Sequence, residues 1–262
     1  MGAILELQGV SMSFGGLKAV DNLSFTVNEN EIVSIIGPNG SGKTTTFNVI
    51  SGLYEPDSGD ILLKGESVAG LRPDAVHDKG ISRTFQSLRL FSNMSVLDNV
   101  LVGMHSVTDS GVIASMLRLP KVRREEKAMR ERAQEILAMF PGRFSGPRQQ
   151  QPAFSLSYAN RRRLEIARAL ASNPTLLMLD EPVAGMNPME SHEVMEQIKI
   201  LRDKGYTIIM IEHDMHVVEG VSDRVIAMDH GVKIAEGTYH EVANDPQVVE
   251  AYLGKRAAEA TA

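Results

Sequence analysis

The chain has 262 residues, no cysteine and a formal net charge of −6, so it can bury one large core but can form neither a disulfide framework nor a cysteine-ligated metal site. Its acidic pI of about 5.7 argues against a basic nucleic-acid surface, and we expect no nucleic acid among its partners. The first residues lack the basic segment of a signal peptide, and no run reaches the roughly 18–20 apolar residues of a membrane-spanning helix, so we expect any membrane role to come through a partner.

The first third of the chain is dominated by predicted strands. Apolar runs separated by turn residues predict strands over 4–12, 18–27 and 31–36, a further strand bounded by glycines over 59–65, and another over 81–85. A helix is predicted over 43–51, directly after a glycine-rich loop.

That loop, Gly37-Pro-Asn-Gly-Ser-Gly-Lys43-Thr44, is the most informative segment. Its glycines let the backbone curl so that N–H groups face phosphate oxygens, and the dipole of the following helix favours the same anion. Lys43 is expected to reach the β- and γ-phosphates and the Thr44 hydroxyl to ligate Mg²⁺. A glycine-rich turn without a ligand is the alternative. The predicted nucleotide-binding residues here are Gly37, Pro38, Asn39, Gly40, Ser41, Gly42, Lys43, Thr44 and Thr45.

From about residue 88 to 171 the pattern is helical and amphipathic. The stretch 122–140 is highly charged along one face, and a Pro/Gly/Gln-rich segment over 141–152 predicts a loop. This block lies between strand-rich segments, and we interpret it as an inserted helical subdomain.

The run over 176–182, Leu-Leu-Met-Leu-Asp-Glu-Pro, predicts a buried strand that ends in two carboxylates. Successive strand side chains point to opposite faces, so we expect different roles: Asp180 in the Mg²⁺ shell and Glu181 polarising the attacking water. Further strands over 206–211 and 224–228 alternate with helices over 189–204 and 215–220. This alternation predicts a parallel sheet with helices on both faces. Residues 255–262 are expected to be disordered.

With these motifs in order, the chain resembles the nucleotide-binding subunit of an ATP-binding cassette (ABC) transporter over nearly its whole length. The resemblance implies an α/β P-loop ABC domain over 1–254, with an N-terminal antiparallel β subdomain. Residues 1–87 and 173–254 would form the RecA-like core with the β subdomain, and 88–172 the helical subdomain that carries the signature motif. The implied cofactors are ATP and Mg²⁺.

The resemblance also implies roles for residues that the motifs alone leave open. Phe14 occupies the position of an aromatic that stacks on adenine. Gln86, in Arg83-Thr-Phe-Gln86, matches the glutamine whose carbonyl ligates Mg²⁺ and whose loop moves with the transmembrane partner. His213, in Ile211-Glu-His213-Asp, matches the switch histidine at the γ-phosphate. With Glu181, Gln86 and His213 complete the expected catalytic set.

The signature motif departs from the family. The expected L-S-G-G-Q is Leu156-Ser157-Tyr158-Ala159-Asn160 in this chain. In the family this loop presses on ATP held by a second subunit, and we expect the Ala159 Cβ to hinder that approach. Ser157, Tyr158, Ala159 and Asn160 would thus act on the partner's ATP, and we expect a heterodimer with one stronger and one weaker site.

More specifically, the chain resembles the branched-chain amino-acid uptake ATPases in four segments, 80–91, 94–103, 211–215 and 249–254. The implied partners are membrane permease subunits, a second ATPase subunit and, indirectly, an extracytoplasmic solute-binding protein. The implied location is the cytoplasmic face of the membrane. Leu88, Leu90 and Phe91 are candidates for docking the permease, with subdomain core as the alternative. Alternative functions are uptake of urea or amides, lipid or lipopolysaccharide export, a DNA- or ribosome-directed ABC ATPase, and a P-loop phosphotransferase.

Overall fold

The computed structural model describes residues 2–104 and 120–253, with the side chains of 120–123 left out. The described chain forms two compact units. The first contains residues 2–83, 175–182 and 198–253, and the second contains residues 84–104, 120–174 and 183–197. The tail predicted to be disordered, 255–262, lies outside the described residues.

The first unit contains a four-stranded antiparallel sheet in the order β2-β1-β4-β5. The long strands β1 (Ala3–Phe14) and β2 (Leu17–Asn28) form a hairpin, and β4 (Ser58–Leu63) and β5 (Glu66–Ser67) continue the sheet beside β1. Leu5, Leu7 and Val10 of β1 point into the core, each at most 3% exposed. Because polar residues alternate with these apolar ones, one face of the sheet is buried and the other is solvated.

The second sheet of this unit has six strands in the order β10-β9-β3-β8-β7-β6. The inner strands β3 (Ile32–Ile36), β8 (Thr207–Ile211) and β7 (Leu176–Asp180) are buried at every residue. They pair in parallel with each other, and with β9 (Arg224–Asp229) and β6 (Ile81–Arg83). Only the edge strand β10 (Val232–Gly237) runs antiparallel. The continuous apolar runs therefore predicted the parallel sheet correctly.

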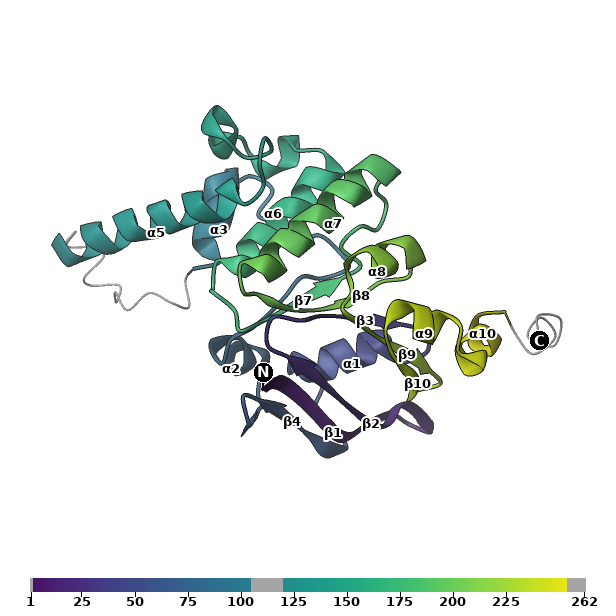
Figure 1. The fold of residues 1–262 in the computed structure, drawn as a ribbon. Helices are drawn as coiled ribbons and strands as arrows, with labels where there is room; N and C mark the ends of the chain where they lie inside the picture. The colour runs from purple at the N-terminus through teal and green to yellow at the C-terminus, as the bar shows by residue number, and fades with distance from the viewer. Residues whose placement is uncertain (1, 105–119, 254–262) are drawn as a thin grey trace. The chain divides into compact units, whose positions relative to one another are not determined.

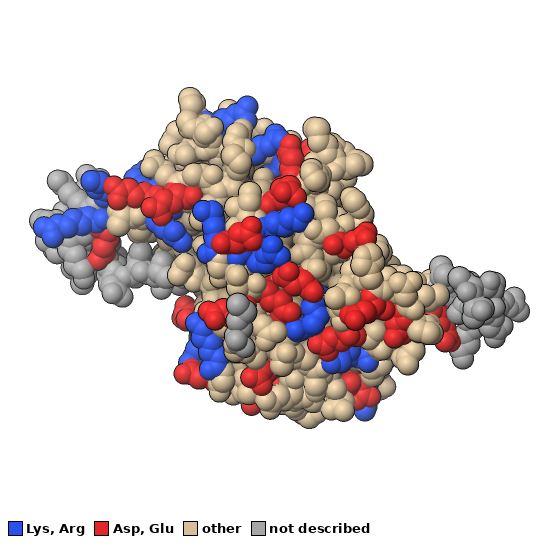
Figure 2. Space-filling view, viewed as in Figure 1, with Lys and Arg blue, Asp and Glu red and all other residues tan. Residues whose placement is uncertain are grey.

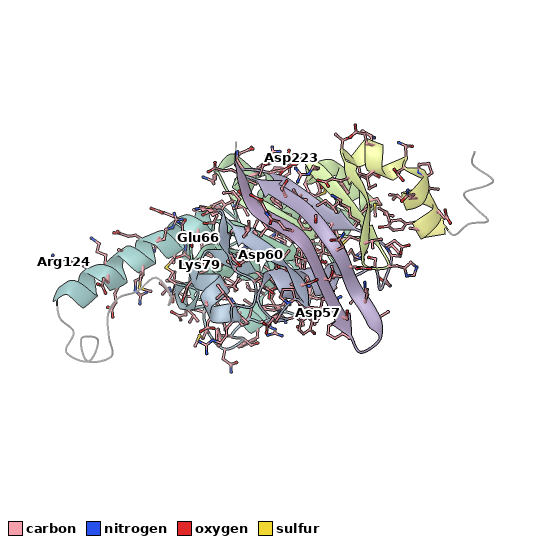
Figure 3. All side chains as sticks on the ribbon, turned by 90° about the horizontal axis from the view of Figure 1, so that it is seen from below. Asp57, Asp60, Glu66, Lys79, Arg124 and Asp223 are labelled. Carbon is pink, nitrogen blue, oxygen red and sulfur yellow. The ribbon has the colours of Figure 1, made fainter. Side chains whose placement is uncertain are left out.

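Helices cover the strands of the first unit (Figure 1). Helix α1 (Lys43–Ile50) shares one core with both sheets: Phe47 and Ile50 pack with Val10 of β1 and Ile35 of β3. A second core joins the sheet to α8 (Met215–Val221), α9 (Tyr239–Ala243) and α10 (Pro246–Leu253). Helix α2 (Pro73–Asp78) is followed by its C-cap residue Lys79, whose ammonium pairs with Glu66 of β5 at 2.6 Å (Figure 3). The carboxyl ends of β3, β7 and β8 lie at one edge of this sheet, and the phosphate loop, Glu181 and His213 follow these strand ends in the first unit.

The second unit is helical. It contains α3 (Val96–Val102), α5 (Pro120–Ala138), α6 (Tyr158–Leu170) and residues 188–197 of α7 (Pro188–Asp203), with short 3₁₀ turns η2 (Gly146–Gln150) and η3 (Ala153–Ser155). Along the part of the chain that the structure describes, no helix combines the length and apolar character needed to cross a membrane. Figure 2 shows basic and acidic side chains intermixed over the visible face.

Two predicted boundaries in this region are wrong. The helical prediction began near residue 88, but α3 begins only at Val96, because the buried Asn99 amide binds the carbonyls of Phe91, Met94 and Ser95 and holds residues 91–95 in a loop. The strand predicted to reach Phe85 ends at Arg83. The carbonyls of Phe85 and Gln86 bind the Arg162 guanidinium instead of a neighbouring strand.

Candidate functional site

The loop between β3 and α1 has the backbone geometry of a phosphate cradle. Gly37, Gly40 and Gly42 have φ values of 150°, 83° and 101°. A Cβ on Gly37 would lie 2.1 Å from the Met228 carbonyl oxygen, and one on Gly42 would lie 2.3 Å from that of Ala19. Only glycine fits these two positions, since their conformation and the close backbone both exclude a side chain. No side chain caps α1, which begins at Lys43, so its first N–H groups face the loop as an anion-binding end.

The ammonium of Lys43 lies within this loop. Its Nζ donates hydrogen bonds to the carbonyl oxygens of Gly37 (2.7 Å) and Pro38 (2.9 Å) and to Ser41 Oγ (3.3 Å). Burial lowers the pKa of Lys43 below its ordinary value, and the negative charge of Glu181 opposes that shift. A positive group is thus held where phosphate oxygens would enter the loop, with a carboxylate close enough to affect it.

The two carboxylates after the apolar run of β7 point to different partners. Asp180 is the last residue of the strand, and its Oδ2 accepts a hydrogen bond from Arg83 Nη2 at 2.8 Å. Glu181 follows in a left-handed conformation, φ 49°, and its N–H donates to the Ile211 carbonyl. The two side chains have different partners, but strand pleating, the reason given for that prediction, is wrong. Glu181 lies beyond the end of β7, and its left-handed backbone conformation sets the direction of its side chain.

Glu181 and His213 come together in the first unit. His213 Nδ1 lies 3.7 Å from Glu181 Oε1, and the His213 side chain is 61% exposed. His213 follows the last residue of β8 by two positions. The fully buried Glu212 fixes this turn, because its carboxylate accepts the N–H groups of His213 and Asp214 at 3.1 and 3.4 Å. Sequence reasoning missed Glu212.

Phe14, the predicted adenine platform, ends β1 and is 46% exposed. Its ring meets that of Tyr54 edge to face, with centroids 5.3 Å apart. Tyr54, which follows helix α1 in the sequence, was not predicted as a site residue. Two partly exposed aromatic rings in contact form a surface on which a base can stack, and the adenine role of Phe14 remains a prediction.

The predicted Mg²⁺ ligands have suitable chemistry. The described residues contain no group of three or more His, Cys, Asp and Glu side chains that could hold a metal ion. Mg²⁺ prefers oxygen ligands and is commonly held by one or two carboxylates together with substrate phosphates and water, rather than by a protein cage. The oxygens of Thr44 and Asp180 in the first unit, and of the exposed Gln86 in the second, match that chemistry.

The divergent signature begins helix α6 of the second unit. Ser157 caps the helix by accepting the Asn160 N–H at 3.3 Å, and Asn160 Oδ1 accepts from Arg163 Nη1 at 3.0 Å. Ala159 is 2% exposed, whereas Tyr158 is 44% exposed and its ring lies against Gly185. The bulky residue on the surface of this motif is therefore Tyr158, and Ala159 is packed inside the unit.

Two charged residues of helix α6, Arg162 and Glu165, form a clamp that hydrogen bonds to the backbone of the segment that carries Gln86. Arg162 donates to the carbonyls of Phe85 and Gln86, and Glu165 accepts the Arg89 N–H at 3.2 Å. Arg162 and Glu165 form an ion pair at 3.0 Å, and their side chains are 2% and 1% exposed. Burial raises the pKa of Glu165, while the Arg89 backbone and Arg162 oppose the shift. This clamp was not predicted, because its charged residues give no local sign of burial.

The C-terminal helix α10 touches the phosphate loop. Burial raises the pKa of Tyr252, and a hydrogen bond from the Gly37 backbone to its hydroxyl opposes that rise. A cleft of about 510 Å³ lies beside this contact, between the tip of the phosphate loop, the β9–β10 turn and α10. It is lined by Pro38, Asn39, Asp229, His230, Ile234, Gln247, Glu250 and Ala251.

Comparison with known proteins agrees with this geometry. Residues 20–184 match the family described as ABC transporter, and residues 232–258 match the branched-chain amino acid ATP-binding cassette transporter family. The chain is 44% identical to the high-affinity branched-chain amino acid transport ATP-binding protein LivG of Salmonella typhimurium, over 96% of this chain and 98% of LivG. It is 41% identical to BraF of Pseudomonas aeruginosa over the same shares.

Solved structures agree as well. The ADP conformation of MJ1267, an ATP-binding cassette of an ABC transporter, superposes with a TM-score of 0.84 at 34% identity, over 97% of this chain and 100% of that structure. A nucleotide-free cassette gives 0.83 at 33% identity, with the same coverage. Because the ABC transporter family model covers residues 20–184 and the relatives match nearly the whole chain, the chain belongs to the ABC transporter family of ATP-binding cassettes.

Proposed function

We propose that this chain is the ATP-hydrolysing subunit of an importer for branched-chain or other hydrophobic amino acids, attached by permease subunits to the cytoplasmic face of the membrane. The observation that carries the proposal is the whole-chain similarity to LivG and BraF, which continues into the C-terminal segment 232–258. In such a transporter the ATPase subunit does not bind the transported solute. The similarity of this subunit to LivG and BraF therefore supports the choice of solute only indirectly.

Within the proposed function, separate residues of this chain bind the phosphates, the adenine, the attacking water and Mg²⁺. The phosphate loop and Lys43 hold the β- and γ-phosphates, and Phe14 stacks on the adenine. Glu181 orients the attacking water, and His213, 3.7 Å from it, contacts the γ-phosphate. Thr44, Asp180 and Gln86 would hold Mg²⁺, which neutralises charge on the phosphates when it is bound with ATP.

The permease is proposed to dock on the second unit around the segment after Gln86. Phe91, Met94 and Phe154 are 40–57% exposed. Two backbone hydrogen bonds, from Phe154 to Ser92 and from Ala153 to Met94, hold these loops side by side. Exposed apolar side chains gathered on one surface favour burial against a partner. The remaining partners, a second ATPase subunit and an extracytoplasmic solute-binding protein, follow from the same proposal.

The test is uptake of radiolabelled leucine by vesicles that contain this chain with its permease and second ATPase subunit. We expect ATP-dependent uptake with the unaltered chain. Glu181→Gln should retain ATP binding but lose at least about 100-fold in turnover, the scale of removing one preorganised catalytic group. Export of solute would overturn the import proposal, and retained turnover in Glu181→Gln would overturn the role of Glu181.

A further inference from the structure

We propose that Arg83 is a positioning residue of the ATPase site, which fixes the Asp180 carboxylate relative to the helix that carries Lys43 and Thr44. The role rests on the proposed Mg²⁺ site, in which Asp180 is a ligand. Arg83 is the last residue of β6 and Asp180 the last residue of the neighbouring parallel strand β7. Both side chains therefore leave the sheet at the edge where the phosphate loop lies.

The two ends of the Arg83 guanidinium serve different elements. Nη2 donates to Asp180 Oδ2 at 2.8 Å, while Nη1 donates to Asn48 Oδ1 at 2.7 Å and to Ser51 Oγ at 3.0 Å. Asn48 lies in α1 and Ser51 caps its carboxyl end. The guanidinium carbon also lies 5.4 Å from the centre of the Phe47 ring. One planar group thus links the end of β7 to the helix that follows the phosphate loop.

The Arg83–Asp180 ion pair is buried, so it is costly to break and sensitive to the geometry of its partners. The Arg83 and Asp180 side chains are only 6% and 5% exposed. A buried carboxylate that loses its charged partner is strongly disfavoured, so Asp180 is held against Arg83 rather than rotating freely. A lysine could not reproduce the arrangement, because its single ammonium lacks the fork that reaches two elements at once and lacks the planar face that lies over Phe47.

The contact with Arg83 orients the Asp180 carboxylate for its proposed role as an Mg²⁺ ligand. A ligand carboxylate is oriented by the groups that hydrogen bond to it, and losing such a group commonly costs 10–100-fold in metal affinity. Arg83 orients Asp180 and also holds α1, the helix that presents Thr44. The two proposed ligands of the first unit are therefore positioned through one side chain. Loss of the fork should weaken the response to Mg²⁺ more than it weakens nucleotide binding itself.

The experiment measures binding of the fluorescent analogue MANT-ATP to the full-length chain, in excess EDTA and in excess Mg²⁺. For Arg83→Lys we expect affinity in EDTA within about twofold of the unaltered chain, and a gain on adding Mg²⁺ that is about tenfold smaller. Arg83→Gln, which keeps donors but no charge, should lose at least as much of the Mg²⁺ response. Thermal unfolding of each variant reports the structural contribution separately.

The matched control is Arg224→Lys in the same unit. Arg224 is also an arginine whose guanidinium bridges two groups: it pairs with Glu31 and Glu236 at 2.8 and 3.2 Å, and its side chain is 19% exposed, but it begins β9 at the opposite end of the parallel strands. Its variant should keep the full Mg²⁺ response whatever happens to its stability. A lowered unfolding temperature in Arg83→Lys with an unchanged Mg²⁺ response would reduce Arg83 to a structural ion pair and overturn the proposal.

Three further outcomes separate this inference from the proposed function. Equal losses of MANT-ATP affinity in EDTA and in Mg²⁺ would show that Arg83 shapes the phosphate loop and not Asp180, which also overturns the inference. An unaltered chain that binds MANT-ATP but gains nothing from Mg²⁺ would reject the proposed metal site and, with it, this role of Arg83. An unaltered chain that does not bind MANT-ATP would instead contradict the nucleotide site.

Discussion

Glu181 is held in a left-handed backbone conformation that residues other than glycine and asparagine rarely adopt. Such conformations cost free energy and persist where the surrounding structure imposes them, often at functional sites. We predict that Glu181→Gly unfolds with a free energy about 1 kcal/mol higher than Glu181→Ala, which keeps the strained backbone. Both variants should lose turnover. Urea unfolding measures the difference, and equal stability would mean that this turn stores no strain.

At the residue scale, the sequence predicted groups that carry a local signal. The phosphate loop, Asp180, Glu181 and His213 each stand in a short motif beside an apolar strand, and the strand ends bring them to one edge. Arg83, Glu212 and Asn99 could not be predicted in the same way. Each is a polar residue whose burial depends on a partner supplied by another segment or by the local turn, and the sequence does not show where that partner lies.

At the element scale, the clamp on α6 makes a stability prediction. Arg162→Met should lower the free energy of unfolding by about 3 kcal/mol, because it leaves the buried Glu165 carboxylate without its charged partner. Adding Glu165→Gln should recover part of that loss, since the amide oxygen still accepts the Arg89 N–H without carrying a charge. Urea unfolding of both variants is the measurement. A double variant no more stable than Arg162→Met would contradict the buried-charge explanation.

A capping box at the start of α9 makes a pH prediction. Glu241 accepts from the Thr238 N–H at 2.7 Å and from its hydroxyl at 2.8 Å, and the backbone bond first, then the hydroxyl, lowers the pKa of Glu241 below 4.5. A lowered carboxyl pKa stabilises the fold above the unfolded value of 4.5, and that contribution is lost as pH falls through the folded value. We therefore expect the unaltered chain to exceed Glu241→Gln in stability at pH 7.

The difference between these two chains should shrink as the pH falls below 4.5, because the unfolded chain then binds a proton at Glu241, and the folded chain binds it only as the pH passes through its own lower pKa. Chemical unfolding at pH 7 and pH 3.5 gives the comparison. Thr238→Val serves as the control, because it removes the hydroxyl of the same cap without removing an ionisable group. A pH-independent difference between the unaltered chain and Glu241→Gln would contradict a role for the ionised carboxylate.

The elements predicted best are those whose own sequence determines their burial. Strands β3, β7 and β8 are continuous apolar runs, and α5 is a long charged amphipathic helix, so periodicity was sufficient. The short elements β5, α2, α9 and α10 were not predicted, because elements of two to eight residues carry little periodicity and depend on caps and neighbours. Residues 88–95 were predicted to be helical for the converse reason: their amphipathic pattern is sound, but the Asn99 amide binds the backbone carbonyls that a helix would use.

At the scale of the whole molecule, the two units differ in how closely their proposed site residues follow the family pattern. The first unit carries a phosphate loop, Asp180, Glu181 and His213 that match the family, whereas the signature of the second departs from it. The observed burial moves the concern from Ala159 to Tyr158, whose ring is exposed beside Gly185. In a head-to-tail dimer, a bulky signature residue would affect the ATP held by the other subunit and not the ATP held by this one.

This asymmetry predicts that the isolated chain does not form a stable ATP-bound homodimer. We expect Glu181→Gln, which binds ATP without turnover, to remain monomeric on a sizing column in ATP and to dimerise when the second ATPase subunit is added. Tyr158→Gly should favour a homodimer, because it removes the exposed ring and restores the family residue, while Tyr239→Phe alters a tyrosine on α9 and should leave assembly unchanged. An ATP-dependent homodimer of Glu181→Gln alone would contradict the heterodimer and show that the divergent signature still closes on ATP.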